Sequence, residues 1–167
     1  MPTLIKWRDG KARVFEDPFT SVDDDQVIPP GDVIISLTRF QAEGETLMSQ
    51  SRLVGVRLAP DEAVEVLAYD LARIPLVALT FPKFRDGRPF SAARILRERL
   101  GFTGELRAVG DVLLEQAKFM IRCGFDAFEP ADGSRADQWT AAGQRFRHVY
   151  QRAADGAAPA FVERATG

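Results

Sequence analysis

The strongest constraint on the fold is an alternation of short apolar runs with segments of helical periodicity. From Phe81 to Glu129 the chain passes through a strand end, a charged loop, a helix, a strand, a second helix and another strand. Continuous β-branched runs are typical of strands covered on both faces, and a helix between two strands makes them parallel. We therefore expect about five mainly parallel strands, at residues 33–37, 53–58, 76–81, 105–109 and 125–129.

This pattern predicts an α/β domain, although two architectures fit it. About five β–α units are too few for a complete eight-stranded barrel, so either a three-layer open sheet or a partial β/α barrel is expected. The dipeptide Asp9-Gly10 lies between two short strand-like runs and favours a tight turn, which predicts a small, peripheral N-terminal hairpin. We divide the chain into a hairpin with an acidic loop (1–32), the α/β domain (33–152) and a flexible tail rich in Ala, Gly and Pro (153–167).

Helix starts are predicted from side chains that can accept hydrogen bonds from a first helical turn. Such residues precede four helix-type segments, and the predicted caps are Asp61, Ser91, Asp111 and Ser134. A further short helix is expected within residues 41–50. The final helix carries an apolar stripe formed by Trp139, Ala142, Phe146, Val149 and Tyr150.

Composition excludes several classes of function. The net charge of −2 gives the whole chain no electrostatic reason to bind nucleic acid or an anionic membrane. A single His and a single Cys cannot form a Cys/His zinc site or hold an iron–sulfur cluster. The usual glycine-rich phosphate loops are absent from the sequence. No apolar run is long enough to span a bilayer, no signal peptide is evident, and the lone cysteine fits a reducing cytoplasm.

Ligands of parallel α/β sheets bind where the loops leave the carboxyl ends of the strands. The segment from Lys83 to Arg107 contains seven cations and three carboxylates, whereas the whole chain is negative. The paired N–H donors of arginine guanidinium groups and the free backbone N–H groups of a helix N-terminus can bind a small oxyanion. The predicted anion-binding residues are Lys83, Arg85, Arg88, Arg94 and Arg107. The alternative is that the helical arginines form an ordinary solvated face.

The catalytic residues are unknown, and the candidates are Asp86, Asp111 and Lys83. Asp86 and Asp111, with Glu129, would form a carboxylate group at one sheet end, usable as a base or a metal clamp, although no spacing requires a metal. Lys83 would form a Schiff base or bind an anion only if it were buried. The alternatives are that Asp111 is simply a helix cap and that Lys83 is solvated.

The two residue types most often catalytic each occur once. Cys123 is interpreted as a small buried hydrophobe, because no second cysteine could resolve an intramolecular disulfide. His148 is expected to be exposed on the final helix. Neither residue is therefore assigned to the site.

The run FPKFRDGRPFSAARILRERLGFTGELRAVGDVLLEQAKFMIRCGFDAFE resembles an uncharacterised bacterial family, the domain-of-unknown-function family nine-three-four. The resemblance is specific over about residues 81–130 and weaker elsewhere. The resemblance implies that members occur beside genes of assimilatory sulfite reduction and cysteine synthesis, and so suggests a role in these pathways. Some members are labelled oxidoreductases. The resemblance carries over no catalytic residues, and no redox cysteine pair or cofactor motif supports that label.

Two hypotheses of function follow. The protein is an accessory factor of assimilatory sulfite reduction with sulfite reductase as its partner, or it is a small enzyme acting on an anionic metabolite. A flavin-binding oxidoreductase is a weaker third alternative, and the cofactor is otherwise unknown. The nearly all-apolar segment 112–123 favours an assembly such as a homodimer.

Overall fold

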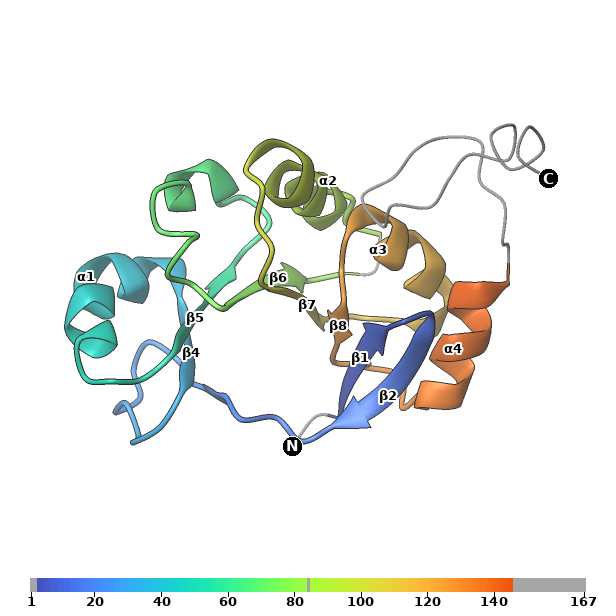
Figure 1. Cartoon of the computed structure of the whole chain (residues 1–167), viewed down its shortest axis with the longest axis horizontal. Helices are drawn as coiled ribbons and strands as arrows, with labels where there is room; N and C mark the ends of the chain where they lie inside the picture. Colours follow the sequence, from blue (N-terminus) through green and yellow to red (C-terminus); the bar gives the residue numbers. More distant parts are fainter. Residues whose placement is uncertain (1–2, 84, 146–167) are drawn as a thin grey trace.

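The computed structural model describes residues 3–83 and 85–145 and shows one curled, eight-stranded sheet with helices (Figure 1). The strand order is β2-β1-β8-β7-β6-β5-β4-β3. The strands are β1 (Leu4–Arg8), β2 (Lys11–Phe15), β3 (Thr20–Ser21), β4 (Val33–Ser36), β5 (Val54–Leu58), β6 (Leu76–Phe81), β7 (Glu105–Gly110) and β8 (Ala127–Phe128). Strands β3 to β8 are parallel, whereas β1 is antiparallel to both β2 and β8.

The helices are short. They are α1 (Leu37–Met48), α2 (Arg88–Arg94), α3 (Ala117–Cys123) and α4 (Ala136–Gln144). A π-helical turn at Ile95–Arg99 extends α2, and 3-10 turns occupy Val64–Leu67 and Leu114–Gln116. Among the described residues no helix is both long and apolar enough to cross a membrane.

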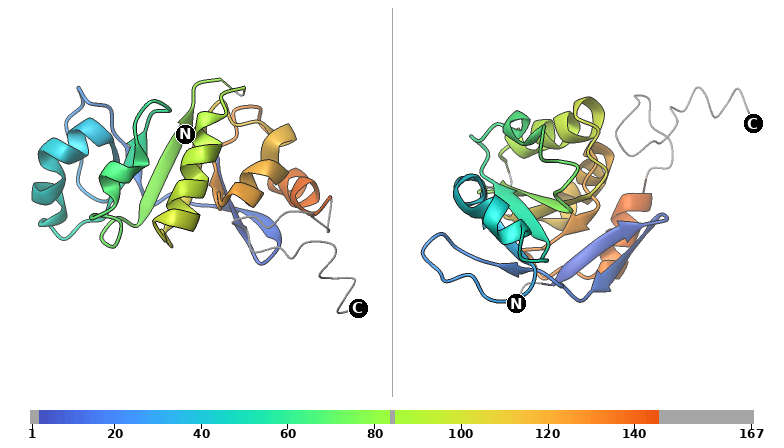
Figure 2. Two further views of the ribbon diagram at one scale, coloured as in Figure 1. Left: turned by 90° about the horizontal axis from the view of Figure 1, so that it is seen from above. Right: turned by 60° about the vertical axis from the view of Figure 1, so that its left-hand side comes forward.

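All crossovers place their helices on one face of the sheet. The parallel strands follow one another in chain order, and right-handed connections then always return on the same side. Figure 2 (left) shows α1, α2 and α3 side by side over the strands. Figure 1 shows the connection from β2 to β3 on the opposite side. We call this opposite side the inner face.

The two faces of the sheet differ in chemistry because strand side chains alternate. Residues such as Val56, Leu79 and Leu106 point toward the helices and belong to the main core. On the inner face a smaller apolar cluster of Ile34, Leu76 and Ala78 packs against Phe19 and Val109. The inner face also holds Arg107, a buried charged side chain with no exposed surface.

The expected α/β class and the five expected strands are confirmed, but the sheet is larger than predicted. It gains β1, β2 and β3, and it is only partly parallel. The hairpin forms around Asp9 and Gly10, whose φ angles of 54° and 76° suit a tight turn. It extends the sheet instead of lying apart from it, because β1 pairs with β8.

The predicted helix starts are wrong. The segment after Asp61 forms only a 3-10 turn. Ser91 lies inside α2, which begins earlier, at Arg88, because Pro89 has a φ angle suited to a first helical turn.

Asp111 and Ser134 also cap no helix. The chain bends at Asp111, and Leu113 is extended before a 3-10 turn at Leu114–Gln116. Before α4, the backbone N–H of Arg135 donates to Gln138 Oε1 at 2.8 Å, while Ser134 Oγ accepts from Trp139 Nε1 at 2.8 Å. Several predictions concern residues outside the described part of the chain. They are the predicted flexible tail, the exposure of His148, and the part of the apolar stripe formed by Phe146, Val149 and Tyr150.

The end of β7 depends on a glycine. Gly110 has a φ of 91°, and a Cβ there would collide with the carbonyl oxygen of Phe81 on β6. We predict that Gly110→Ala lowers the free energy of unfolding by more than about 2 kcal/mol, because it adds this collision to the cost of left-handed backbone.

Substitutions of two other glycines provide matched controls, and the free energy of unfolding of each variant is measured by urea denaturation. Gly101 has a φ of 68° but open space around it, so Gly101→Ala should cost only about 1–2 kcal/mol. Gly87 has open space and an ordinary φ of −86°, so Gly87→Ala should leave stability within about 0.5 kcal/mol. Equal losses at Gly110 and Gly101 would contradict the steric argument.

Candidate functional site

The loop between β6 and α2 carries most of the predicted site at the carboxyl end of β6. Lys83 and Arg85 are exposed there. Asp86 and Arg88 form a tight pair, in which Asp86 Oδ1 accepts from the Arg88 backbone N–H and from Nε, each at 3.0 Å. Arg88 Nη2 donates to Asp86 Oδ2 at 2.7 Å. The Asp86 side chain is 12% exposed and that of Arg88 60% exposed, so the carboxylate is largely covered while the cation faces solvent.

This pairing sets the protonation of Asp86. The side-chain hydrogen bond from Arg88 and the backbone hydrogen bond from the same residue hold the pKa of Asp86 below its usual range. A carboxylate with a lowered pKa is a weaker general base. The geometry therefore gives Asp86 the task of orienting Arg88.

Asp111 lies next to the same strand end. Its backbone N–H donates to the carbonyl oxygen of Phe81 at 2.7 Å, which joins the ends of β6 and β7. Its side chain is half-buried. The structure thus brings the backbone of Asp111 to the point from which the loop of Lys83 departs.

Arg94 points to a different part of the molecule. It forms an ion pair with Glu98 one turn later at 3.8 Å, and it lies beside the thiol of Cys123 on α3. Cys123 is fully buried, as predicted, and its burial raises the pKa of the thiol although Arg94 and Arg122 oppose the shift. Arg94 is therefore part of the α2–α3 contact.

Arg107 is the centre of a buried ion network on the inner face. Its Nη1 donates to Asp17 Oδ2 at 2.7 Å and to Glu129 Oε2 at 3.1 Å, and its Nε donates to Glu105 Oε2 at 2.9 Å. Burial disfavours the charge, but the hydrogen bond to Asp17 and the charge of Glu105 outweigh it and raise the pKa of Arg107. The chain's own carboxylates therefore satisfy this guanidinium, which stands apart from the exposed loop cations.

Strand register places Arg107 in a row that crosses the inner face. Neighbouring members are register partners on adjacent strands, and the row comprises Arg13, Lys6, Ala127, Arg107, Ala78, Arg57 and Ser36. Lys6 Nζ contacts Glu105 at 2.8 Å, and Arg57 Nη1 donates to Ser21 Oγ at 2.9 Å. From Lys6 to Ser36, cations in this row alternate with small side chains, while Arg13 extends it with a second cation beside Lys6.

Sequence reasoning missed this row, although a signal was present. In β7 the polar residues Glu105 and Arg107 alternate with Leu106 and Ala108. Strict alternation indicates a strand with one polar face. Because apolar elements are expected to cover both faces of these strands, the sequence interpretation does not include a polar face on β7.

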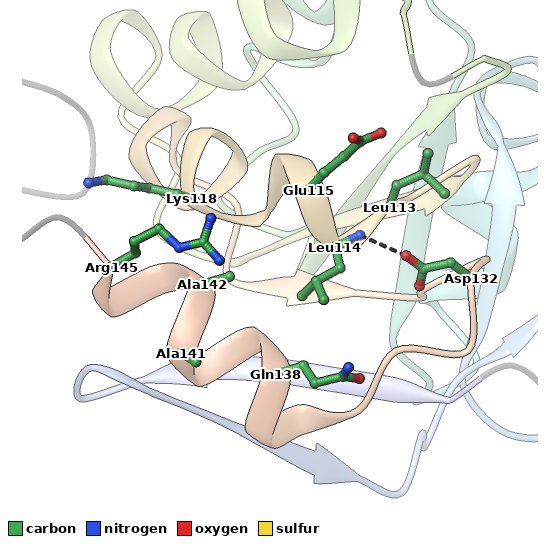
Figure 3. Close-up of a pocket in the computed structure, with 9 residues that line it drawn as sticks. All are labelled: Leu113, Leu114, Glu115, Lys118, Asp132, Gln138, Ala141, Ala142 and Arg145. Carbon is green, nitrogen blue, oxygen red and sulfur yellow. Dashed lines mark hydrogen bonds between the residues drawn. The ribbon is translucent and has the colours of Figure 1, made fainter.

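A pocket with a volume of about 760 Å³ lies between α3 and α4 (Figure 3). Leu113, Leu114 and Ala142 give it apolar walls, and Glu115 and Lys118 lie at its rim. The Leu114 backbone N–H donates to Asp132 Oδ2 at 2.9 Å and holds one wall. None of the residues predicted for anion binding lines this pocket.

The three carboxylates considered for a metal clamp, Asp86, Asp111 and Glu129, form no metal-binding group among the described residues. Glu129 is engaged by Arg107, and Asp86 by Arg88. Within residues 3–83 and 85–145 there is no group of three or more His, Cys, Asp or Glu side chains able to hold a metal ion.

Comparison with protein families identifies a match over most of the α/β part of the chain. The family described as "Bacterial protein of unknown function (DUF934)" matches residues 55–161. This range includes β5 to β8 and the loop of Lys83, and it excludes the hairpin. A search of curated proteins found no match.

The Asp86–Arg88 pair predicts an abnormal titration. Asp86 should titrate below its ordinary value of 3.8, because the folded state stabilises the carboxylate. A depressed acid pKa contributes stability above the unfolded pKa, and this contribution is lost as the pH falls through the lower folded value. Carboxyl ¹³C NMR should show the Asp86 midpoint returning toward 3.8 in Arg88→Gln but not in Arg94→Gln. Equal midpoints in wild type and Arg88→Gln would contradict the pairing.

Proposed function

The chain belongs to the bacterial family of unknown function DUF934, and we propose that it is an accessory protein of assimilatory sulfite reduction. In this proposal the loop between β6 and α2 binds an acidic surface of sulfite reductase. A small oxyanion such as sulfite would compete for the same cations. The observation that carries the proposal is that the side chains of Lys83 and Arg85 on this loop, and of Arg88 at the start of α2, are exposed, while the carboxylate of Asp86 is largely covered.

The loop is better suited to binding than to proton transfer. Asp86 is paired and its pKa is lowered, so it is a poor base. Lys83 is exposed, whereas nucleophilic lysines are desolvated. Two of the candidate catalytic residues thus lack the surroundings that such a role requires.

The choice of pathway rests on the family resemblance. The resemblance implies that members occur beside genes of assimilatory sulfite reduction, so the reductase is the partner to test first. Exposed cations at the rim of an interface steer an acidic partner and raise its association rate. Such an interaction weakens as salt screens the charges.

The test is binding of the protein to sulfite reductase from the same bacterium, measured by biolayer interferometry at low and at physiological ionic strength. Lys83→Gln/Arg85→Gln should weaken binding about three- to tenfold at low salt, mainly through a slower association rate, since each rim charge contributes about 0.2–1 kcal/mol. Sulfite in excess should compete with the reductase.

A matched control removes two exposed cations elsewhere. Arg99→Gln/Arg135→Gln changes the net charge by the same amount and should bind like the wild type. Absence of binding at micromolar concentration, or equal losses in both double variants, would rule out the loop as the docking site.

A further inference from the structure

A second cationic surface lies on the hairpin, which the family match does not include. Strand alternation puts Lys6 and Arg8 of β1 and Lys11 and Arg13 of β2 on the inner face. We call these four residues the hairpin cations. Together with Asp9 and Phe15 they line a hollow of about 330 Å³.

The hairpin cations face one another directly. Lys6 is the register partner of Arg13, and Arg8 is the register partner of Lys11. Like charges opposite each other on adjacent strands destabilise a hairpin. These like-charge pairs therefore lower the free energy of unfolding. Proteins tolerate such destabilising arrangements mainly at functional sites, including binding sites.

Carboxylates of the described residues neutralise only part of this charge. Lys6 contacts Glu105 at 2.8 Å, but no ion pair to Arg8, Lys11 or Arg13 occurs within the described part of the chain. Lys6 Nζ and the Arg8 guanidinium lie over the ring of Phe15, at 5.1 Å and 5.2 Å from its centre. These contacts hold Lys6 and Arg8 beside Phe15, which also lines the hollow.

An extended peptide cannot add to β2 along its whole edge. The Ala12 backbone N–H donates to Thr140 Oγ1 at 2.9 Å, and the Ala12 carbonyl accepts from the same hydroxyl at 3.3 Å. Gln144 Nε2 donates to the Gly10 carbonyl, so α4 covers this edge. Figure 2 (right) shows α4 lying against the hairpin. Recognition is thereby left to the inner face and its side chains.

We propose that the hairpin cations bind a small polyanion of the diphosphate class in this hollow. Its volume falls at the lower end of the range for small-molecule sites, about 300–1,000 Å³. Arginine forks recognise phosphoryl oxygens with paired hydrogen bonds, and lysine adds a point charge. This site is separate from the loop of Lys83 and does not depend on the function proposed for that loop.

The test is isothermal titration calorimetry with inorganic pyrophosphate at low ionic strength, using the full chain. The wild type should bind one pyrophosphate, and Lys11→Gln/Arg13→Gln should bind at least tenfold more weakly. Arg99→Gln/Arg135→Gln, which removes two exposed cations outside both surfaces, should bind like the wild type. The affinity of the wild type should fall as salt is added.

Thermal unfolding separates lost binding from lost structure. Without ligand, Lys11→Gln/Arg13→Gln should melt at the same temperature as the wild type or above it, because like-charge pairs are removed. Undiminished pyrophosphate binding in this variant would overturn the proposal, as would no saturable binding to the wild type. Binding of a polyglutamate peptide without binding of pyrophosphate would also overturn it, and would assign the surface to an acidic protein partner.

Discussion

The inner face of the sheet depends on the buried guanidinium of Arg107. Its three carboxylate partners come from three places in the chain: Asp17 in the β2–β3 connection, Glu105 in β7 and Glu129 after β8. A buried cation must be paired, and removal of one partner of such a pair typically costs about 3–5 kcal/mol. Because Asp17 lies far from Arg107 in sequence, its bond fixes the N-terminal segment across the sheet.

This constraint separates two surfaces with different chemistry. Because the parallel strands follow one another in chain order, every crossover helix lies on the same side of the sheet. The opposite, inner face is therefore lined by the N-terminal segment and the hairpin. Glu105 binds both Arg107 and Lys6, which links the buried network to the hairpin cations. The loop after β6 lies beyond this network, at the carboxyl ends of the parallel strands. The loop of Lys83 and the hairpin cations thus lie at different parts of one sheet.

Periodicity predicted the fold better than it predicted the site. The runs at 33–37 and 76–81 are apolar enough to predict buried strands. The dipeptide Asp9-Gly10 predicts the hairpin turn. The pairing of β1 with β8 was not predictable, because it joins segments more than 100 residues apart. The helix starts failed because Pro89 and the Ser134 contact with Trp139 override local capping preferences.

Closeness in sequence predicts which charged residues lie near one another, but not which tertiary partners they have. Lys83 and Arg85 lie on the loop after β6, and Arg88 follows at the first residue of α2. Arg107 looked like another member of that set, since sequence distance does not reveal the carboxylate of Asp17. The hairpin cations were overlooked because the hairpin was treated as peripheral.

A double-mutant cycle between Asp17 and Arg107 tests the central claim most directly. The free energy of unfolding would be measured by urea denaturation for wild type, Asp17→Asn, Arg107→Gln and the double variant. We predict a coupling free energy of about 1–3 kcal/mol, because each single change leaves the other group buried without its partner. Additive effects within about 0.5 kcal/mol would show that the two side chains are energetically independent, and would contradict this account of the inner face.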